Sequence, residues 1–151
     1  MDIRALRPED EEAWLPLWRG YLDFYAATLP EEVTRTTWQR LHDPAEPVHG
    51  LGAFDAGGRL VGIAHYIFHR STWSAASHCY LNDLFTLPEA RGAGVGRALI
   101  GRVYAEAEAV GAGRVHWLTH ETNAVAQKLY DRVADRPGFV QYRKALADAR
   151  R

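Results

Sequence analysis

The sequence predicts an α/β fold (α+β in its segregated first half), with a mixed central β-sheet flanked by helices on both faces. Hydrophobic residues alternate with strand period or follow helical spacing in the order β-α-α-β-β-β-α-β-α-β. The early strands follow one another through hairpins, whereas the later strands are separated by helices, and this combination gives a mixed sheet. The length of 151 residues, 47% of them apolar, suits one globular domain.

The first elements are a strand and a long amphipathic helix. Residues 2–7 form a strand that Pro8 ends. Residues 10–27 form a helix, and Pro16 predicts that its regular part begins near Ala13, because proline is tolerated only in a first turn. The apolar face of this helix consists of Trp14, Leu17, Trp18, Tyr21, Phe24 and Tyr25.

A second helix and a hairpin follow. Residues 30–43 begin with proline and two acidic residues, which are signals for a helix start. Strands over 51–54 and 60–68 flank residues 55–58, where a glycine pair supplies the positive φ of a hairpin turn. We expect residues 70–76 to be a polar connection.

The second half alternates strands and helices. The expected elements are a strand over 78–87, a helix over 94–110 capped by 111–113, a strand over 114–119, a helix over 123–133 and a last strand over 139–144. The inward face of the last helix carries Ala126, Leu129 and Tyr130. The tail, residues 145–151, is short and polar, and we expect it to fray.

The composition excludes several classes of protein. A formal net charge of -1 gives no basic excess for nucleic acid and no polybasic run for a membrane surface. The single Cys79 forms no intramolecular disulfide and suits a reducing compartment. The charged N-terminus does not resemble a signal peptide, and no apolar run is long enough for a transmembrane helix. We therefore expect a cytoplasmic protein.

The most informative stretch is the glycine-rich turn between the 78–87 strand and the next helix. Gly92, Gly94 and Gly96 lack a Cβ at alternate positions, and the turn leads into a helix N-terminus. Backbone N–H groups and the helix dipole make such a turn an anion cradle, best suited to a pyrophosphate. It lacks the ending of a P-loop and the Gly-x-Gly-x-x-Gly spacing of a dinucleotide site.

The sequence Arg91-Gly92-Ala93-Gly94-Val95-Gly96 resembles the Arg/Gln-x-x-Gly-x-Gly/Ala motif of the GNAT superfamily of N-acetyltransferases. The preceding strand 81–86 and the pair Asn123 and Tyr130, seven residues apart, strengthen the resemblance. It extends over nearly the whole chain and is nearest to the small polyamine/histone-type members, similar to diamine acetyltransferases. It implies the GNAT fold and acetyl-CoA as cosubstrate, with no metal.

The resemblance also implies which residues bind acetyl-CoA. The pantetheine arm would pair with the backbone of the strand, and the loop amides would hold the pyrophosphate. The implied residues are Leu84, Phe85, Thr86, Arg91, Gly92, Ala93, Gly94, Val95, Gly96, Arg97 and Asn123.

The catalytic acid implied by the resemblance is Tyr130. A phenol with an ordinary pKa of about 10 is protonated at neutral pH and can give a proton to the leaving thiolate. Tyr130 also fits a core position on its helix, and Asn123 fits an N-cap. Cys79 lies ahead of the cofactor motif with no activating base beside it in sequence, so we expect direct attack in a ternary complex.

The general base is less clearly marked. Asn82 and Asp83 stand where related diamine acetyltransferases carry a Glu-Asp pair, and an amide cannot accept a proton. Strand alternation predicts that the two side chains point to opposite faces, which leaves Asp83 as the first candidate. The alternatives are Glu121, His65, His78, His116 and His120, or no dedicated base. The spacing of His65, His69 and His78 fits no standard metal site.

The acceptor site is expected among the first two helices and the strands opposite CoA. Aromatic faces favour ammonium groups, so Trp18, Tyr21 and Tyr25 are candidates together with Asn82. Trp38 and the acids Asp23, Glu31 and Glu32 are further options, although core packing also explains the aromatic stripe.

The predicted function is acetyl transfer to a primary amine: a polyamine, an amino acid or a lysine side chain. The alternative is a non-catalytic acyl-CoA-binding sensor. We treat the chain as one acetyltransferase domain, with an acceptor-side half over 1–76 and a CoA-binding half over 77–144. A homodimer through the last strand is a further possibility, whereas nucleic acid and membranes are not expected partners.

Overall fold

The computed structural model describes residues 1–146, and by its internal contacts the chain divides into two compact units, residues 1–118 and 119–151. The first unit contains the sheet, three of the helices and the glycine-rich turn, whereas the second contains the last helix. Among the described residues, no helix is both long and apolar enough to cross a lipid bilayer.

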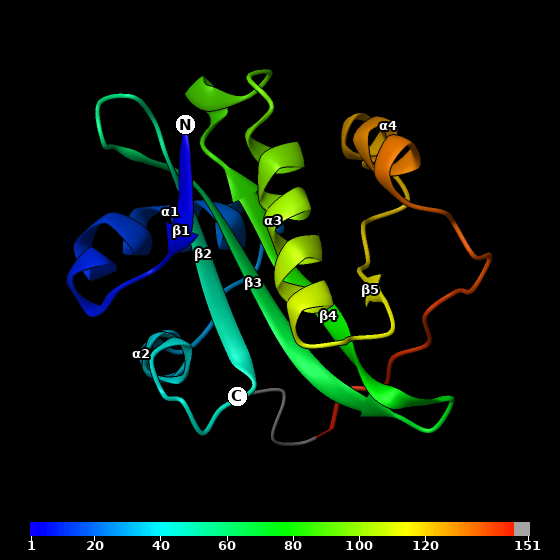
Figure 1. Cartoon of the computed structure of the whole chain (residues 1–151). Coiled ribbons are helices and arrows are strands. Elements are labelled where there is room, and N and C mark those ends of the chain that lie inside the picture. Colours follow the sequence, from blue (N-terminus) through cyan, green and yellow to red (C-terminus); the bar gives the residue numbers. More distant parts are fainter. Residues whose placement is uncertain (147–151) are drawn as a thin grey trace. The chain divides into compact units, whose positions relative to one another are not determined.

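The first unit is built on a five-stranded sheet with the order β1-β2-β3-β4-β5 (Figure 1). The strands are β1 (Asp2–Ala5), β2 (Val48–Phe54), β3 (Leu60–Ser71), β4 (Ser74–Thr86) and β5 (Val115–His116). The first four strands pair antiparallel, and β5 pairs parallel to β4. The predicted mixed sheet is therefore confirmed.

Helices cover both faces of this sheet, as predicted (Figure 1). Two of them, α1 (Glu11–Phe24) and α2 (Glu31–Leu41), lie on one face, and α3 (Val95–Ala109) lies on the other. Short 3-10 turns, η1 (Pro8–Asp10) and η2 (Pro88–Ala90), precede α1 and the glycine-rich loop.

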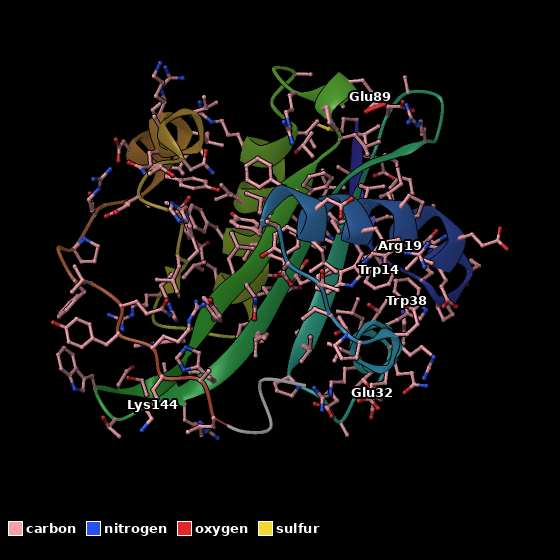
Figure 2. All side chains as sticks on the ribbon, turned by 180° about the vertical axis from the view of Figure 1, so that it is seen from behind. Trp14, Arg19, Glu32, Trp38, Glu89 and Lys144 are labelled. Atoms are coloured by element: carbon pink, nitrogen blue, oxygen red, sulfur yellow. The ribbon has the colours of Figure 1, made fainter. Side chains whose placement is uncertain are left out.

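The hydrophobic core on the α1 side is rich in aromatic rings. Its buried residues are Leu6, Trp14, Leu17, Trp18, Trp38, Phe54, Leu60, Ile63 and Phe85. Trp14 and Trp38 point toward each other from α1 and α2, with ring centroids 4.7 Å apart (Figure 2). Burying rings of this size supplies much of the hydrophobic stabilisation of the unit.

On the opposite face, α3 approaches the sheet closely at one glycine. A Cβ added to Gly62 of β3 would lie 2.6 Å from Cγ1 of Val95, the first residue of α3. Real Cβ atoms essentially never approach another atom this closely, so the absence of a side chain at position 62 lets the start of α3 lie against β3 with Val95 in its present position.

The start of α1 differs from the prediction. The helix begins at Glu11, and Pro16 lies inside it rather than in its first turn. The missing N–H of Pro16 would have bonded to the carbonyl of Glu12, so the helix lacks one hydrogen bond there. Burial of Trp14, Leu17 and Trp18 against the sheet outweighs that loss.

The predicted polar connection over 70–76 is wrong, because β3 and β4 form a longer hairpin there. Ser71 pairs with Ser74, and only Thr72 and Trp73 lie between the strands. The sequence did not reveal these strand residues, because polar residues occupy both faces of the β3–β4 pair beyond the core. Apolar and polar residues therefore do not alternate there. In the earlier hairpin only Gly58 has a positive φ (82°), so one glycine of the predicted pair supplies the turn.

The strand predicted over 114–119 is much shorter in the structure. Val115 pairs with Cys79 and His116 with Tyr80, and pairing then stops. Beyond Tyr80, the edge of β4 facing β5 has no β5 residue paired with it. The sequence pattern gave no sign of this, because the residues after His116 remain as apolar as those of a strand.

The second unit contains α4 (Ala124–Val133), and its start is capped by Asn123. Asn123 Oδ1 accepts a hydrogen bond from the N–H of Ala126 at 3.4 Å, which confirms the N-cap reading. Leu129 and Tyr130 are half-buried, in agreement with the predicted inward face.

The last predicted strand, 139–144, is wrong: the described residues after α4, up to 146, contain no strand. Phe139, Val140 and Tyr142 are exposed at 82%, 80% and 93%. Their pattern suits a strand, but a strand needs a partner, and the described part of this unit offers no other strand to pair with. Of the predicted tail, residues 147–151 lie outside the described part of the chain.

Candidate active site

The glycine-rich loop has the backbone conformation that its sequence predicts. Gly92 and Gly94 have φ values of 84° and 80°, in the left-handed region that favours glycine. A Cβ built at either position would meet no atom within 4 Å. The inner space beside these glycines is therefore open in the first unit, and a ligand can approach the backbone closely.

The loop ends at the N-terminus of α3, which has unused donors. Gly94 is the N-cap, and the first helical hydrogen bond runs from the N–H of Ala98 to the carbonyl of Gly94 at 3.0 Å. The N–H groups of residues 95–97 precede that bond, and no side chain caps the helix start. The first turn carries no acidic residue, and Arg97 is exposed there. These features fit the pyrophosphate of CoA.

Arg91 links the loop to the end of β4. Its Nε donates to the carbonyl of Thr86 at 3.3 Å, and its guanidinium lies 5.7 Å from the Phe24 ring and 5.8 Å from the Phe85 ring. The side chain is therefore turned toward β4 and α1, where it fixes the loop, and the loop presents its backbone toward the open side.

Within the first unit, the C-terminal part of β4 has no strand paired with its outer edge, beside this loop. The N–H of Leu87 donates to Val61 of β3 at 2.9 Å, so alternation directs the backbone groups of Phe85 toward β3 as well. The backbone groups of Leu84 and Thr86 then point toward the other side, where pairing with β5 has already stopped. Apart from the Thr86 carbonyl, which accepts from Arg91, these backbone groups of the first unit can pair with an extended ligand segment.

A β-bulge interrupts β4 just before that edge. Asp83 pairs with His65 and Leu81 with Tyr66, so Asn82 is the extra residue opposite β3. The prediction that Asn82 and Asp83 point to opposite faces is wrong: Asn82 Nδ2 donates to Asp83 Oδ1 at 3.1 Å. The bulge breaks the period-two alternation and brings both side chains together.

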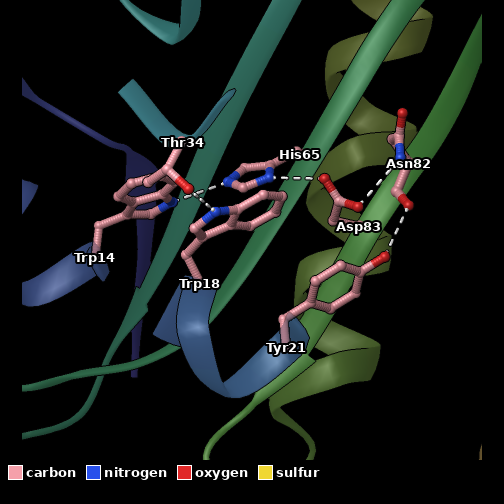
Figure 3. A network of polar contacts seen from close by, with 7 residues as sticks. All are labelled: Trp14, Trp18, Tyr21, Thr34, His65, Asn82 and Asp83. Atoms are coloured by element: carbon pink, nitrogen blue, oxygen red, sulfur yellow. Dashed lines mark hydrogen bonds and ion pairs between the residues drawn. The ribbon is translucent and has the colours of Figure 1, made fainter. Parts of the chain in front are cut away.

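Asp83 belongs to a chain of polar contacts that crosses the aromatic core (Figure 3). The indole Nε1 of Trp14 donates to His65 Nε2 at 3.0 Å, and His65 Nδ1 lies 2.9 Å from Asp83 Oδ2. The side chain of His65 is 2% exposed and that of Asp83 is 11% exposed. Asp83 is therefore a carboxylate with one end in the core and the other end beside the exposed Asn82.

Tyr21 lies next to the bulge from the α1 side. Its hydroxyl donates to the backbone carbonyl of Asn82 at 3.4 Å (Figure 3). Burial raises the pKa of Tyr21 and the charge of Asp83 raises it further, so the hydroxyl stays protonated and acts as a donor. Burial and the charge of Asp83 also raise the pKa of Tyr25, whose ring lies 5.1 Å from that of Tyr21.

The other aromatic acceptor candidates are core residues. Trp18 is 5% exposed and its Nε1 donates to Thr34 Oγ1 at 3.0 Å, and Trp38 is 7% exposed. Tyr25 is 42% exposed. Of the predicted acceptor residues, the structure therefore brings Tyr21 and Asn82 together with Asp83, leaves Tyr25 at the surface and places Trp18 in the core.

Within the first unit, Cys79 and the histidine pair His69 and His116 lie away from the bulge. Burial raises the pKa of the fully buried Cys79 to about 11, so its thiolate is scarce at neutral pH, consistent with direct attack. His69 Nε2 lies 2.8 Å from His116 Nε2, at the end of β3 remote from the loop. Within residues 1–146, no group of three or more His, Cys, Asp or Glu side chains is arranged for a metal.

Tyr130 and Asn123 lie in the second unit, on α4 and at its N-cap. Tyr130 is half-buried, and its backbone carbonyl accepts from the N–H of Ala134 at 2.9 Å. Their roles toward acetyl-CoA stay predictions.

Comparison with known proteins agrees with this description. Residues 12–134 match the acetyltransferase (GNAT) family. The chain is 41% identical to the D-amino-acid N-acetyltransferase HPA3 of Saccharomyces cerevisiae over 143 residues, which cover 94% of this chain and 89% of the relative.

Solved structures show the same fold. A probable acetyltransferase superposes with a TM-score of 0.86 at 25% identity, covering 98% of this chain and 99% of its own. The aminoglycoside acetyltransferase AAC(6')-Iy, in complex with a bisubstrate analogue of CoA, gives 0.81 at 20% identity, with coverages of 96% and 98%. A ribosomal-protein-alanine N-acetyltransferase from Brucella melitensis gives 0.78 at 21%, with coverages of 97% and 100%.

The fold, the uncapped helix behind a glycine loop and these relatives define an acyltransferase that uses acetyl-CoA. The chain belongs to the GNAT family of acetyltransferases, and it is an N-acetyltransferase.

Two hydrogen bonds of the site, from Trp14 to His65 and from His65 to Asp83, were not predicted from the sequence. His65 was one of several possible bases, and Trp14 was assigned only to the apolar face of its helix. Neither the bulge at Asn82 nor the hydrogen bond from Trp14 to His65, 51 positions apart, leaves a local pattern in the sequence.

Proposed function

We propose that this enzyme transfers the acetyl group of acetyl-CoA to the primary amine of a free amino acid, by direct attack in a ternary complex. The observation that carries the proposal is the bulge in β4, which gathers Asp83, Asn82 and the Tyr21 hydroxyl beside the open strand edge. The yeast relative named a D-amino-acid N-acetyltransferase supports an amino acid over a polyamine or a lysine side chain.

Acetyl-CoA would be held by backbone groups. The N–H groups of residues 92–97 would bind the pyrophosphate, and the backbone of Leu84 and Thr86 would pair with the pantetheine arm. One of these strand N–H groups would polarise the acetyl carbonyl, as an oxyanion donor does. When bound, acetyl-CoA supplies an activated acyl group with a thiolate leaving group.

Asp83 would receive the amine. Its carboxylate pairs with the ammonium form and takes the first of the two protons that the nitrogen must lose, directly or through water. The neutral nitrogen then forms a bond to the acetyl carbon, the bond from that carbon to sulfur breaks, and the second proton leaves the nitrogen to water. Tyr130 would give its proton to the departing thiolate, so acid and base are separate residues.

Thiol release from acetyl-CoA tests this proposal against a panel of amines. The panel contains D- and L-amino acids, spermidine and a lysine-bearing peptide with a blocked N-terminus. We expect amino acids to give the largest kcat/KM. A clear preference for spermidine or for the peptide contradicts the acceptor class, and CoA binding without turnover on any amine favours the sensor alternative.

A homodimer and a cytoplasmic location remain part of the proposal. The exposed apolar side chains of Phe139, Val140 and Tyr142 support self-association of the second unit. Light scattering after gel filtration gives the mass directly, and 17.0 kDa would contradict a dimer. We also propose that the chain is one acetyltransferase domain, in which residues 1–76 bind the acceptor and residues 77–144 bind CoA.

A further inference from the structure

The contacts of His65 fix its protonated ring nitrogen. An indole N–H is only a donor, so His65 Nε2, which receives the Trp14 hydrogen bond at 3.0 Å, must carry a lone pair. A neutral imidazole then carries its proton on Nδ1. That N–H donates to Asp83 Oδ2 at 2.9 Å (Figure 3). Trp14 thus selects the form of His65 that donates to the carboxylate.

Both carboxylate oxygens of Asp83 accept a hydrogen bond from a neighbouring side chain. Oδ2 accepts from His65, and Oδ1 accepts from Nδ2 of Asn82 at 3.1 Å. Two donors from opposite directions fix the plane of a carboxylate, and each oxygen keeps a further lone pair for an incoming ammonium group. The orientation of Asp83 therefore depends on a residue of β3 and on its own neighbour in the bulge.

The surroundings of His65 give no packing reason for a histidine. Its ring lies 5.9 Å from Trp14 and 5.5 Å from Trp18, and Ile63 and Phe85 belong to the same buried cluster. A polar ring in an apolar core costs free energy unless its nitrogens are bonded. An aliphatic side chain would fill this place at a lower cost in free energy, so the hydrogen bonds of the ring nitrogens explain the histidine.

We propose that His65 is a positioning residue of the acetyl-transfer site, which orients the Asp83 carboxylate toward the acceptor amine and is itself held in its donating form by Trp14. This rests on the proposed function, in which Asp83 receives the amine. A displacement of about 1 Å in a reacting group can lower a rate by about 100-fold. A buried chain that starts in a rigid aromatic core limits such displacements.

A pair of variants of nearly equal size tests the role of His65. His65→Leu removes both ring nitrogens, whereas His65→Asn keeps an amide that can donate from about the position of Nδ1. We expect His65→Leu to lower kcat/KM for the amine by roughly 10- to 100-fold and His65→Asn to restore most of it. The affinity for CoA, measured by calorimetry, should stay within a few-fold in both.

A purely structural role predicts the reverse order, because leucine suits the apolar core better than asparagine. The proposal is overturned if both variants fold and bind CoA but His65→Asn has no higher kcat/KM than His65→Leu. Combining His65→Leu with Asp83→Asn adds a second criterion: if His65 acts through Asp83, the double variant is about as slow as Asp83→Asn alone.

The tautomer can be measured without any variant of His65. In the wild-type enzyme, ¹⁵N NMR should find His65 protonated on Nδ1 and not on Nε2 at the pH of the assay. A proton on Nε2 overturns the proposal even if no His65 variant folds. Trp14→Phe should add the Nε2-protonated form, whereas Trp38→Phe, the same change in the same core without a bond to His65, should not.

The two proposals fail in different ways. If Asp83→Asn is as active as the wild type, the proposed role of Asp83 is wrong and His65 has nothing to position. If Asp83→Asn is inactive but His65→Leu turns over at the wild-type rate, only the role of His65 is wrong.

Discussion

The glycine-rich loop and the bulge in β4 lie in the same unit and provide binding groups in opposite ways. The loop offers backbone N–H groups at an exposed helix start, where Gly92 and Gly94 keep the space free of side chains. The bulge offers side chains, and Asp83 is fixed by contacts that reach into the buried core. A backbone site depends on local conformation, whereas a side-chain site depends on distant residues.

The largest effect is expected at the bulge. Asp83→Asn keeps the shape and removes the proton acceptor, and we expect kcat/KM for the amine to fall by about 1000-fold, within the range for general bases. Asp23→Asn on α1, another acid considered for attracting the acceptor, is the control and should change little because Asp23 is exposed. Steady-state kinetics compares the two variants, with the CoA affinity of each measured alongside. Equal losses of kcat/KM in both variants would mean that the general negative charge of the surface matters, and not Asp83 in particular.

The next largest effect is expected at the loop. Gly94→Val places a branched side chain in the open space and imposes strain at a φ of 80°, and we expect CoA affinity to fall by about 100-fold. Gly58→Val is a matched control, because Gly58 has a φ of 82° and open space in a hairpin turn. Calorimetry with CoA decides: undiminished affinity in Gly94→Val contradicts the loop assignment, and a similar loss in Gly58→Val would show that strain alone is responsible.

A smaller effect is expected from Tyr130, which lies in neither region. Tyr130→Phe should lower kcat by about 10- to 100-fold, because a thiolate is a fairly good leaving group and needs less help than the amine. CoA affinity should stay within a few-fold. Tyr142→Phe, at a position that is 93% exposed, serves as the control. Turnover of Tyr130→Phe equal to that of the wild type would remove Tyr130 as the acid.

The smallest effect concerns the histidine pair at the far end of β3. The N–H on Nδ1 of His69 donates to the Arg70 carbonyl at 2.8 Å, so neutral His69 accepts at Nε2 from His116. Burial lowers the pKa of His116, and the positive charge of Arg114 lowers it further.

The folded state binds a proton on His116 less tightly than the unfolded chain does. The contribution of His116 to the unfolding free energy is therefore fully present above the ordinary histidine pKa of about 6.5. It is lost as the pH falls from there through the folded value. We expect His116→Gln to remove part of this pH dependence of the unfolding free energy, at a cost of about 1 kcal/mol at pH 8 for the lost hydrogen bond. Urea unfolding at pH 8 and pH 5.5 measures it, and an unchanged slope against pH would contradict the prediction.

The contrast between a site that depends on local backbone conformation and a site that depends on distant residues also explains what the sequence could predict. The conformation of the loop at Gly92 and Gly94 was predicted, because glycine at alternate positions before a helix reports a local backbone conformation, whereas Gly96 lies inside α3. The strands and α-helices of residues 1–146 were all predicted near their observed places for similar reasons, since their hydrophobic period is local, although β5 is much shorter than predicted.

The arrangement at Asn82 and Asp83 could not be predicted, because a bulge shifts the register by one residue without a marker residue. The contact from Trp14 to His65 joins a helix to a strand and depends on how the two pack. The short β5 and the missing last strand also depend on partners and not on the residues themselves.

The close approach of Val95 to Gly62 limits how this domain can be recombined with its relatives. A chimaera that keeps loop residues 91–97 but acquires alanine at position 62 places a methyl group 2.6 Å from Val95 Cγ1. Either the Val95 side chain must then rotate, or the start of α3 must move away from the strand, and the N–H groups at the start of α3 move with the helix. Transplanting the glycine-rich loop together with α3 into another scaffold therefore favours transplanting Gly62 as well, although it lies about 30 residues upstream in the sequence.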